Sequence, residues 1–288
     1  MDFSDCRYDG SGTFTLSACP TSARIDKDKR ESIEEATLEN IARMADLQDK
    51  LYADAREGVI ILFQAMDAAG KDSTIKKVMT GLNPQGVNVH NFRQPSSEEL
   101  GHDYLWRAAR HLPQRGFIGL FNRSYYEDVL VTRVHSLQNG YAMPDRCLDM
   151  GADSFYGLRL RQIRDFERHL WENGYRILKI MLNVSPDEQR RRFLERIDNP
   201  AKNWKFSSND LAERELWPQY MQAYEQAISH TSTPESPWYV IPADQKWFAR
   251  YLVSQAVVDV LEACDPQYPT ISEEQRARLA ECRIRLTQ

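Results

Sequence analysis

Five short, continuous apolar segments constrain the fold of this 288-residue chain more than any other feature. They lie at 58–65, 86–92, 116–122, 176–184 and 237–243. Their hydrophobic residues do not alternate with polar ones, which is typical of strands that are buried on both faces. The stretches between them have helical periodicity, and strands that alternate with helices form a parallel sheet with right-handed crossovers. We therefore predict an α/β protein, a three-layer α/β/α sandwich with a parallel five-stranded sheet.

The helical periodicity predicts seven helices and three parts of the chain. A long amphipathic helix is expected at 27–55, where apolar residues recur at helical spacing among charged ones. The further helices are expected at 71–81, 97–112, 153–173, 185–198, 209–230 and 272–285. Residues 1–24 lack periodicity and are predicted to be an N-terminal extension. The main domain is then predicted at 25–265 and a C-terminal helical tail at 266–288.

Composition excludes several classes of protein. With 42% hydrophobic and 27% charged residues, the chain is an ordinary globular protein, and no apolar run is long enough to span a bilayer. The N-terminus lacks the basic and apolar regions of a signal peptide, so we expect a cytoplasmic protein without a membrane partner. Its five cysteines form no CxxC or Cys/His pattern, which predicts reduced thiols and no zinc site. The net charge of -5 argues against nucleic-acid binding, so an anionic ligand requires a local basic patch.

The stretch "QAMDAAGKD" at 64–72 has most features of a phosphate-binding loop. Ala68, Ala69 and Gly70 leave room for backbone N–H groups to face an anion. A helix is expected to begin directly after them, and its N-terminus attracts negative charge. Lys71 would place its own charge on the phosphate that is transferred. The stretch therefore predicts a site for phosphate groups after the first apolar segment.

This loop departs from the usual pattern at two positions. That pattern has Gly at its first position and Ser or Thr after the lysine, where this chain has Ala65 and Asp72. Because the hydroxyl normally binds Mg²⁺, we expect Asp67 to supply a carboxylate to the cation instead. The alternative is a simple helix start, with Asp72 in the first turn and the lysine solvated.

The stretch "FNRSYYEDVLVTRV" at 121–134 brings further side chains to the same edge of the sheet. Phosphoryl transfer needs a second carboxylate on Mg²⁺ and an arginine on the transferred group, and Asp128 and Arg123 fit these roles. The second carboxylate normally stands directly at the strand end, and here it comes several residues later. Alternatively, Glu127 and Asp128 complement the first turn of a helix and pair with Arg123.

A basic segment follows the fourth predicted strand. It combines an apolar face, which includes Phe193 and Leu194, with a face rich in cations. The cations are Arg190, Arg191, Arg192, Arg196, Lys202 and Lys205. Their density on an acidic chain indicates a ligand with many negative charges, and residues 185–210 are predicted to form a lid that excludes water. The alternative is a solvated face on which acidic residues pair with the arginines.

Four stretches, in order and spacing, resemble the family-2 polyphosphate kinases. They are "QAMDAAGKD", "FNRSYYEDVLVTRV", "DEQRRRFLERIDNPAKNWKF" and "SPWYVIPA", and the similarity runs from about Arg24 to Leu261. The resemblance implies a P-loop kinase-like fold with a helical lid. It also implies direct transfer of phosphate between inorganic polyphosphate and a nucleotide, with Mg²⁺, or alternatively Mn²⁺, as the cofactor.

The resemblance also implies roles for individual residues. The catalytic residues would be Asp67, Lys71, Arg123 and Asp128, with the two aspartates as metal ligands. Contacts to nucleotide or polyphosphate would come from Ala68, Ala69, Gly70, Asp72, Lys76, Glu127, Arg133, Arg190, Arg192, Arg196 and Lys205. With Met66 and Asp72 at these positions, the chain resembles the subgroup that accepts both nucleoside mono- and diphosphates. In that subgroup the residue that matches Glu127 is implicated in the use of the diphosphate.

The predicted reaction is in-line phosphoryl transfer from polyphosphate to AMP or ADP. No covalent intermediate is expected, because no His or Cys is positioned as a nucleophile. Two alternatives remain open: an ATP-dependent nucleoside monophosphate kinase, since "FNRSYYED" is also similar to thymidylate kinases, and a non-catalytic anion-binding protein. A homo-oligomer, dimer or tetramer, is expected because the helix at 27–55 exposes apolar positions.

Overall fold

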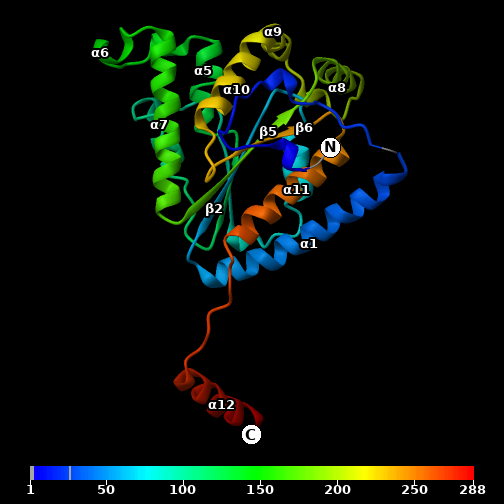
Figure 1. The fold of residues 1–288 in the computed structure, drawn as a ribbon, viewed down its shortest axis with the longest axis vertical. Helices are drawn as coiled ribbons and strands as arrows, with labels where there is room; N and C mark the ends of the chain where they lie inside the picture. Colours follow the sequence, from blue (N-terminus) through cyan, green and yellow to red (C-terminus); the bar gives the residue numbers. More distant parts are fainter. Residues whose placement is uncertain (1–2, 26) are drawn as a thin grey trace.

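The computed structural model of the protein describes residues 3–25 and 27–288 (Figure 1). The first two residues of the predicted extension at 1–24, and residue 26 of the predicted main domain, lie outside the described residues. The described strands form one sheet in the order β1-β6-β5-β2-β4-β3. The strands are β1 (Arg7–Tyr8), β2 (Gly58–Ala65), β3 (Val87–Asn91), β4 (Ile118–Asn122), β5 (Tyr175–Asn183) and β6 (Trp238–Pro242).

All five predicted strands are confirmed, and they pair in parallel. The predicted strand count is wrong, because the sheet has a sixth member that comes from the N-terminal extension. This strand, β1, has two residues and pairs antiparallel with β6, Arg7 opposite Tyr239. A pair of residues is too short to show an apolar run, so the pattern that identified the other strands could not detect it.

Strands β2 and β5 lie side by side in the middle of the sheet, and almost every residue of both is buried. Continuous Val, Ile, Leu and Phe residues suit this position, because helices cover a central parallel strand on both faces. Strand β3 is an edge strand, and Asn88 and Val89 are exposed there. The carboxyl ends of β2, β4 and β3 therefore meet at one edge of the sheet.

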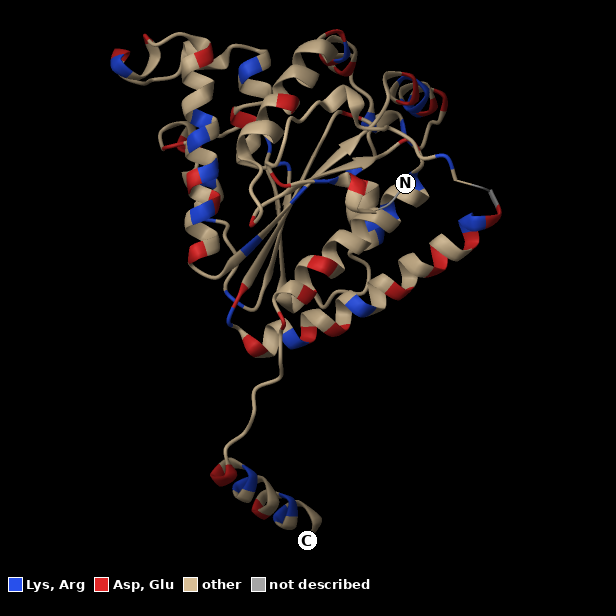
Figure 2. Ribbon diagram, in the orientation of Figure 1, with Lys and Arg blue, Asp and Glu red and all other residues tan. Residues whose placement is uncertain are grey.

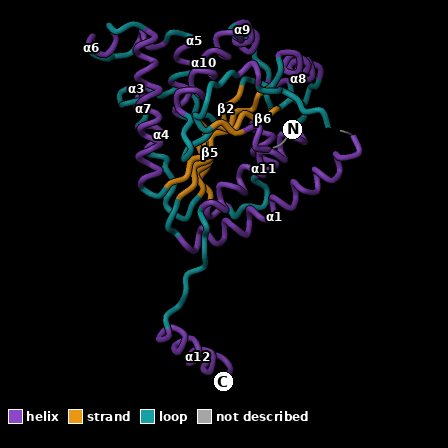
Figure 3. The backbone as a smooth tube through the Cα atoms, viewed as in Figure 1, coloured by secondary structure: helices purple, strands orange, loops and turns teal. Residues whose placement is uncertain are grey.

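Helices cover both faces of the sheet, with α1, α2 and α11 on one side and α7 and α10 on the other (Figures 1 and 3). The long helices are α1 (Arg30–Asp54), α2 (Lys71–Val78), α7 (Ala152–Glu172), α8 (Pro186–Asp198), α9 (Asn209–Glu215), α10 (Trp217–Thr231), α11 (Lys246–Ala263) and α12 (Glu273–Thr287). The one-turn helices are α3 (Ser97–Leu100), α4 (Trp106–Ala109), α5 (Val131–Val134) and α6 (Asp145–Leu148). Short 3₁₀ turns span Phe3–Cys6, Leu16–Ala18, Lys27–Lys29, Pro84–Gly86, Tyr125–Asp128, Leu137–Gly140 and Asn203–Lys205.

Two predicted helices are divided in the structure. The stretch at 97–112 forms α3 and α4, because α3 ends at Gly101 after one turn. The stretch at 209–230 forms α9 and α10, which meet at Leu216, and Pro218 lies in the first turn of α10. A proline in the first turn lacks the N–H that a continuing helix would use, so it starts a new helix there.

Helix α11 is absent from the predicted elements, although it is the most deeply buried helix. It packs between the sheet and α1, and its buried side chains include Phe248, Leu252, Val253, Val257 and Leu261. Because apolar residues occur around most of its circumference, it lacks the polar face by which helices are recognised in a sequence.

Helix α12 projects away from the rest of the molecule on an extended segment, and none of its residues is buried (Figure 1). Charges of both signs alternate along the outer helices, as on α1 and α7 (Figure 2). Among the described residues, no helix combines the length and the apolar character that a bilayer crossing requires.

Candidate active site

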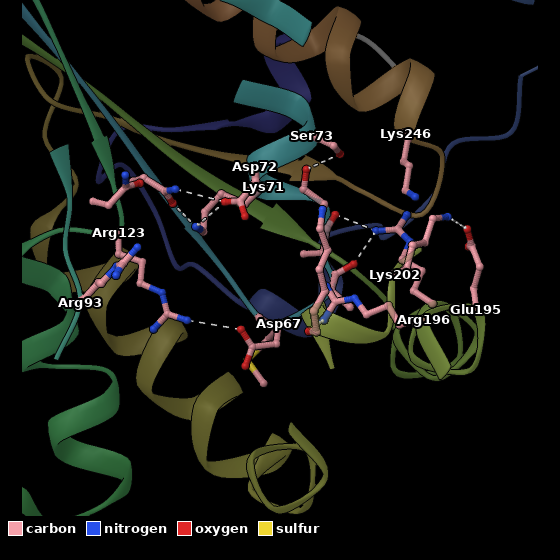
Figure 4. Close-up of a pocket in the computed structure, with 18 of the residues that line it drawn as sticks. Asp67, Lys71, Asp72, Ser73, Arg93, Arg123, Glu195, Arg196, Lys202 and Lys246 are labelled. Carbon is pink, nitrogen blue, oxygen red and sulfur yellow. Dashed lines mark hydrogen bonds and ion pairs between the residues drawn. The ribbon is translucent and has the colours of Figure 1, made fainter. Parts of the chain in front are cut away.

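A cavity of about 730 Å³ opens at the carboxyl ends of β2, β3 and β4 (Figure 4). Its wall consists of the loop after β2, the ends of β3 and β4, helix α8 with the turn that follows it, and the start of α11. The cations of its lining are Lys71, Arg93, Arg123, Arg192, Arg196, Lys202, Lys205 and Lys246. The acids are Asp67, Asp72 and Glu195. The cavity therefore has the surplus of positive charge that an anionic ligand requires.

The loop between β2 and α2 has the backbone geometry of an anion site. Ala68 and Gly70 are both in the left-handed region, with φ of 60° and 97°. Helix α2 begins at Lys71, so its first N–H groups have no partner within the helix. Left-handed turns of this kind direct successive N–H groups to one point, and the helix adds its positive end. The predicted residues Ala68, Ala69 and Gly70 all line the cavity.

Lys71 lies at the floor of the cavity, where only 14% of its side chain is exposed. Its ammonium donates to the Asn122 amide oxygen and lies 3.4 Å from Asp72 Oδ1. Burial lowers the pKa of Lys71, and the nearby Asp72 carboxylate opposes this fall. A neutral amide therefore fixes the ammonium at the strand end, and its charge is only partly compensated within the protein.

Asn122 is a site residue that the sequence predictions do not include. It is the last residue of β4, and its amide also donates to Asp72 Oδ1 at 3.1 Å. The signal was present, because the second polar ligand of a phosphate site normally stands directly at a strand end. The usual pattern has a carboxylate at this position, and this chain has the amide of Asn122 instead.

Arg123 connects two of the predicted acids. Its guanidinium donates to Glu127 Oε2 at 2.9 Å and to Asp67 Oδ1 at 3.3 Å. The Glu127 carboxylate raises the pKa of Arg123, with Asp67 contributing in the same direction, so the guanidinium is a permanent cation. The backbone of Arg123 has a φ of 62°, a left-handed conformation that costs a residue with a side chain roughly 1–2 kcal/mol.

The structure does not bring Asp128 to the cavity, which corrects the expectation that it lies beside Lys71. The carboxylate accepts a hydrogen bond from Tyr141 at 2.8 Å and lies 3.2 Å from Arg159 Nε. Burial raises the pKa of Asp128, and Arg159 and Tyr141 oppose this rise. The chain forms a 3₁₀ turn at Tyr125–Asp128. Its consecutive acids point to different sides, Glu127 to Arg123 and Asp128 to Arg159 of α7.

Arg192 lines the cavity, but its guanidinium is already saturated. It donates to the carbonyl oxygens of Ala68, Ala69, Ala243 and Asp244 at distances from 2.7 to 3.1 Å. Its remaining N–H, on Nε, donates to Glu188. The predicted contact to phosphate is therefore not what the geometry favours, since no donor is left and the side chain instead fixes the phosphate loop to α8.

The other predicted cations are divided between the cavity and the surface. Arg196 and Lys205 line the cavity. Arg190 is exposed beside Asp187, and Lys76 is exposed on α2, so both lie outside the lining. Arg133 lies elsewhere, hydrogen-bonded to Gln226 and to Asp153.

Three cations of the cavity were not among the contacts that the resemblance implied, although one of them, Lys202, lies in the basic segment of the predicted lid. Arg93 follows the end of β3, Lys202 precedes the turn after α8, and Lys246 is the first residue of α11. Burial lowers the pKa of Lys246, and the charge of Arg192 adds to this effect. Lys202 belongs to the basic segment whose cations indicate an anionic ligand in the sequence, whereas Lys246 depends on a helix that the sequence pattern did not predict.

A smaller cavity of about 170 Å³ adjoins the first. The two share Met66, Asp67 and Arg123 in their walls. The rest of the smaller one's lining includes two acidic and two aromatic side chains, Glu127, Glu213, Tyr220 and Tyr224, beside aliphatic residues and Asn209. The side chains of Asp67 and Arg123 therefore lie where a basic and an acidic cavity meet.

Comparison with known proteins gives one consistent result. The family model for Polyphosphate kinase 2 (PPK2) matches residues 26–269. The ADP-polyphosphate phosphotransferase of Rhodopseudomonas palustris is 47% identical over 272 residues, which cover 94% of this chain and 93% of that protein. The AMP/ADP-polyphosphate phosphotransferase of Meiothermus ruber is 46% identical over 253 residues, which cover 85% of this chain and 90% of that protein.

A solved structure agrees with these relatives. The crystal structure of polyphosphate kinase 2 from Arthrobacter aurescens superposes with a TM-score of 0.83 at 38% identity. The superposition covers 96% of this chain and 95% of that one, so it extends over nearly the whole fold. The resemblance seen in the sequence motifs is thereby confirmed, and the chain belongs to the polyphosphate kinase 2 family.

Proposed function

We propose that this protein transfers phosphoryl groups from inorganic polyphosphate to nucleoside mono- and diphosphates, AMP and ADP among them. The observation that carries the proposal is the convergence of cationic side chains on the phosphate loop, in a cavity of about 730 Å³. A chain of phosphates offers charge but no base or ribose, so a basic wall suits it. The relatives from Rhodopseudomonas palustris and Meiothermus ruber are named as phosphotransferases of polyphosphate with ADP or AMP/ADP.

The proposal includes the finer architecture expected from the sequence. The helices on both faces of the sheet support a three-layer, P-loop kinase-like domain at 25–265, followed by the tail at 266–288. Residues 185–210 would act as the lid over the phosphate chain. Its support is that Arg196, Lys202 and Lys205 reach the cavity from this segment. A lid of this kind excludes the water that would otherwise hydrolyse the donor.

Donor and acceptor would occupy different cavities. Polyphosphate would lie in the large basic cavity, with a terminal phosphate against the N–H groups of the loop and Lys71. The acceptor would approach from the smaller cavity, whose Glu127 and Glu213 can accept hydrogen bonds from its hydroxyl groups. Because the cavities meet at Asp67 and Arg123, the acceptor and the leaving phosphate would lie on opposite sides of the transferred group, as in-line transfer requires.

Lys71 and Arg123 would neutralise the charge of the transferred group. Their partners differ, because Lys71 contacts the Asn122 amide and Asp72, whereas Arg123 lies between Asp67 and Glu127. No covalent enzyme intermediate is needed, since the acceptor oxygen attacks the phosphorus atom directly and the remaining polyphosphate leaves with the bridging oxygen. The catalytic task is thus positioning and charge stabilisation.

The oxygen atoms of the cavity suit Mg²⁺, with Mn²⁺ as an alternative. Among the described residues no cluster of three or more His, Cys, Asp or Glu side chains forms a closed metal site. Asp67 and Asp72 nevertheless line the cavity with 38% and 78% of their side chains exposed, and Asn122 adds an amide oxygen. Hard oxygen donors of this kind hold Mg²⁺ together with phosphate oxygens. The bound cation would neutralise charge on the phosphates.

The decisive experiment combines purified protein, Mg²⁺ and polyphosphate with AMP, ADP or GDP, and follows ATP and GTP formation over time. We expect rapid ATP formation that requires polyphosphate. A parallel reaction contains ATP and nucleoside monophosphates without polyphosphate. Rapid transfer in that reaction would favour a nucleoside monophosphate kinase, and no transfer in any reaction would favour a non-catalytic anion-binding protein.

We also propose that the chain forms a homo-oligomer, a dimer or a tetramer. Helix α12 exposes Leu279, Ile284 and Leu286, and α1 exposes Leu38 and Tyr52. A single helix of this length is marginally stable in water without a partner surface. Light scattering on the purified chain should give a mass of two or four copies, and a mass of one copy at micromolar concentration would contradict this proposal.

A further inference from the structure

The side chains of residues 123–128 are divided between the active site and helix α7. Arg123 and Glu127 face the cavities. Tyr125, Tyr126 and Asp128 point the other way and contact side chains of α7. The turn is therefore held from behind by residues that line neither active-site cavity.

One of these contacts is a buried carboxylate. Glu167 Oε1 accepts hydrogen bonds from the hydroxyl groups of Tyr125 and Tyr126, both at 2.8 Å. Its other oxygen, Oε2, lies 2.6 Å from the ammonium of Lys179 on β5. Glu167 and Lys179 are almost completely buried, with 1% and 0% of their side chains exposed. A buried carboxylate with both oxygens paired has one stable position, so it fixes both tyrosines.

The other contact is a buried guanidinium. Arg159 Nε lies 3.2 Å from Asp128 Oδ2. The guanidinium of Arg159 lies over the rings of Tyr104 and Phe155, 3.9 and 4.9 Å from their centres. These rings leave the guanidinium little freedom to follow a displaced carboxylate. The ion pair between Asp128 and Arg159 therefore attaches the end of the turn to α7.

We propose that α7 is a two-point clamp on this turn, and that Asp128, Arg159 and Glu167 are positioning residues for Arg123 and Glu127. The two contacts lie roughly two turns, or about 12 Å, apart on α7 and have opposite charges, so the clamp fixes both the place and the direction of the turn. This inference rests on the proposed function. It gives Asp128 a role that explains its distance from the phosphate loop.

The clamp would hold the backbone of Arg123 in its left-handed conformation. Such a conformation persists only where the surrounding structure determines it, because a relaxed chain would leave it. Release of the turn would let Arg123 move away from the transferred group. A displacement of about 1 Å at a positioning group can lower the rate by about 100-fold.

The test compares the kinetics of Asp128→Asn, Arg159→Gln and the conservative Arg159→Lys. For the first two we expect kcat to fall about 10- to 100-fold, the KM for polyphosphate to stay within about twofold, and the Mg²⁺ dependence to stay unchanged. The double variant D128N/R159Q should lose no more than either single variant, because both break one contact. Arg159→Lys should recover part of kcat. Arg161→Ala, which removes an exposed arginine from the same helix, is the matched control and should leave kcat within about twofold.

Several outcomes would overturn the proposal. A raised Mg²⁺ requirement in Asp128→Asn, with none in Arg159→Gln, would make Asp128 a metal ligand. An unchanged kcat in both variants would show that the contact does not position the turn. If circular dichroism shows that either variant does not fold, the nearly isosteric Tyr125→Phe and Tyr126→Phe variants replace it. We expect the same loss in kcat for them, and an unchanged kcat would again overturn the proposal.

A second measurement separates this proposal from the proposed function. Hydrogen exchange at the backbone amides of residues 123–128 should accelerate in Arg159→Gln and stay unchanged in Arg161→Ala. This readout needs no substrate, so it holds even if the unmodified protein fails to use polyphosphate, a result that would overturn the function alone. Equal exchange in both variants would overturn the clamp.

Discussion

Lys71, at the start of α2, and Lys179, in the middle of β5, are both lysines with little exposure, and their surroundings differ in one respect. Lys179 donates to Glu167 and to the carbonyl oxygen of Thr231, and its ion pair is complete within the protein. Lys71 donates to a neutral amide and has one carboxylate at 3.4 Å. Burial lowers the pKa of both, but only the charge of Lys179 is closely paired inside the fold.

This difference distinguishes charged side chains that stabilise the fold from charged side chains that are available to bind a ligand. The arginines also differ, since the buried Arg192 donates every N–H to the protein, whereas Arg93 is exposed and lines the cavity. A buried cation loses hydration free energy, and the attraction of a nearby anion must compensate this loss. Where no protein anion does so, a phosphate is the natural partner.

The largest expected effect comes from Lys71→Met. We expect kcat for polyphosphate-dependent ATP formation to fall about 10⁴-fold, which corresponds to about 5.5 kcal/mol of activation free energy. The reason is that the variant lacks the ammonium that neutralises the negative charge of the transferred group. The melting temperature should change little, since the fold does not depend on this charge. Lys77→Ala, an exposed lysine on the same helix, is the matched control. More than a tenth of normal kcat in Lys71→Met would contradict the assignment.

Lys179→Met should act on stability instead. The substitution leaves the Glu167 carboxylate buried without its cation, which costs about 3–5 kcal/mol of unfolding free energy. Urea denaturation measures this loss. The double variant K179M/E167Q should be less destabilised than the single one, because the stranded charge is gone. A single variant within about 1 kcal/mol of the unmodified protein would mean that water or another group compensates the carboxylate.

Lys202→Ala and Lys246→Ala should give intermediate effects. Each removes one cation from the wall of the large cavity, so we expect the KM for polyphosphate to rise about threefold to tenfold, with kcat almost unchanged. Added salt should reduce the difference between variant and unmodified protein, since it screens the lost attraction. Lys50→Ala, on α1 and outside the lining, is the control. An equal rise in KM for the control would show a general effect of charge.

The smallest expected effect is an uptake of protons when polyphosphate binds. Burial lowers the pKa of Lys71 below its usual value of 10.5, and a bound polyanion raises it again. At alkaline pH, between these two pKa values, binding should therefore take up a fraction of a proton. Below the lowered pKa the lysine is protonated in both states, and the uptake should vanish. Calorimetry in two buffers with different ionisation enthalpies measures it, and the same uptake in Lys71→Met would assign it to another group.

The sequence predicted the parts of the site that depend on local geometry. The loop with Ala68, Ala69 and Gly70 lies where the pattern put it, because small residues between a buried strand and a helix leave few other conformations. Asp67 and Arg123 also reach the cavity from their strand ends. Asp128 does not, because a 3₁₀ turn sends neighbouring residues in different directions and only the packing of α7 decides which one faces the core.

The same limit explains the basic segment and the missing helix. Arg190, Arg191 and Arg192 are consecutive letters, yet one is exposed beside Asp187, one pairs with Glu188, and one is buried against the phosphate loop. Helical spacing separates them by about 100° each, so the fold assigns their roles. Lys246 was missed because α11 has no polar face along most of its length.

By itself, the sequence determined the parallel strands, the phosphate loop and the family, since buried strands and tight loops follow from the character of adjacent residues. Only the tertiary structure decided which charges have partners. The pairing of Lys179 with Glu167, or of Asp128 with Arg159, joins elements that lie apart in the chain. The reason is that Coulomb attraction and desolvation depend on distance in space and on burial, which a linear pattern does not contain.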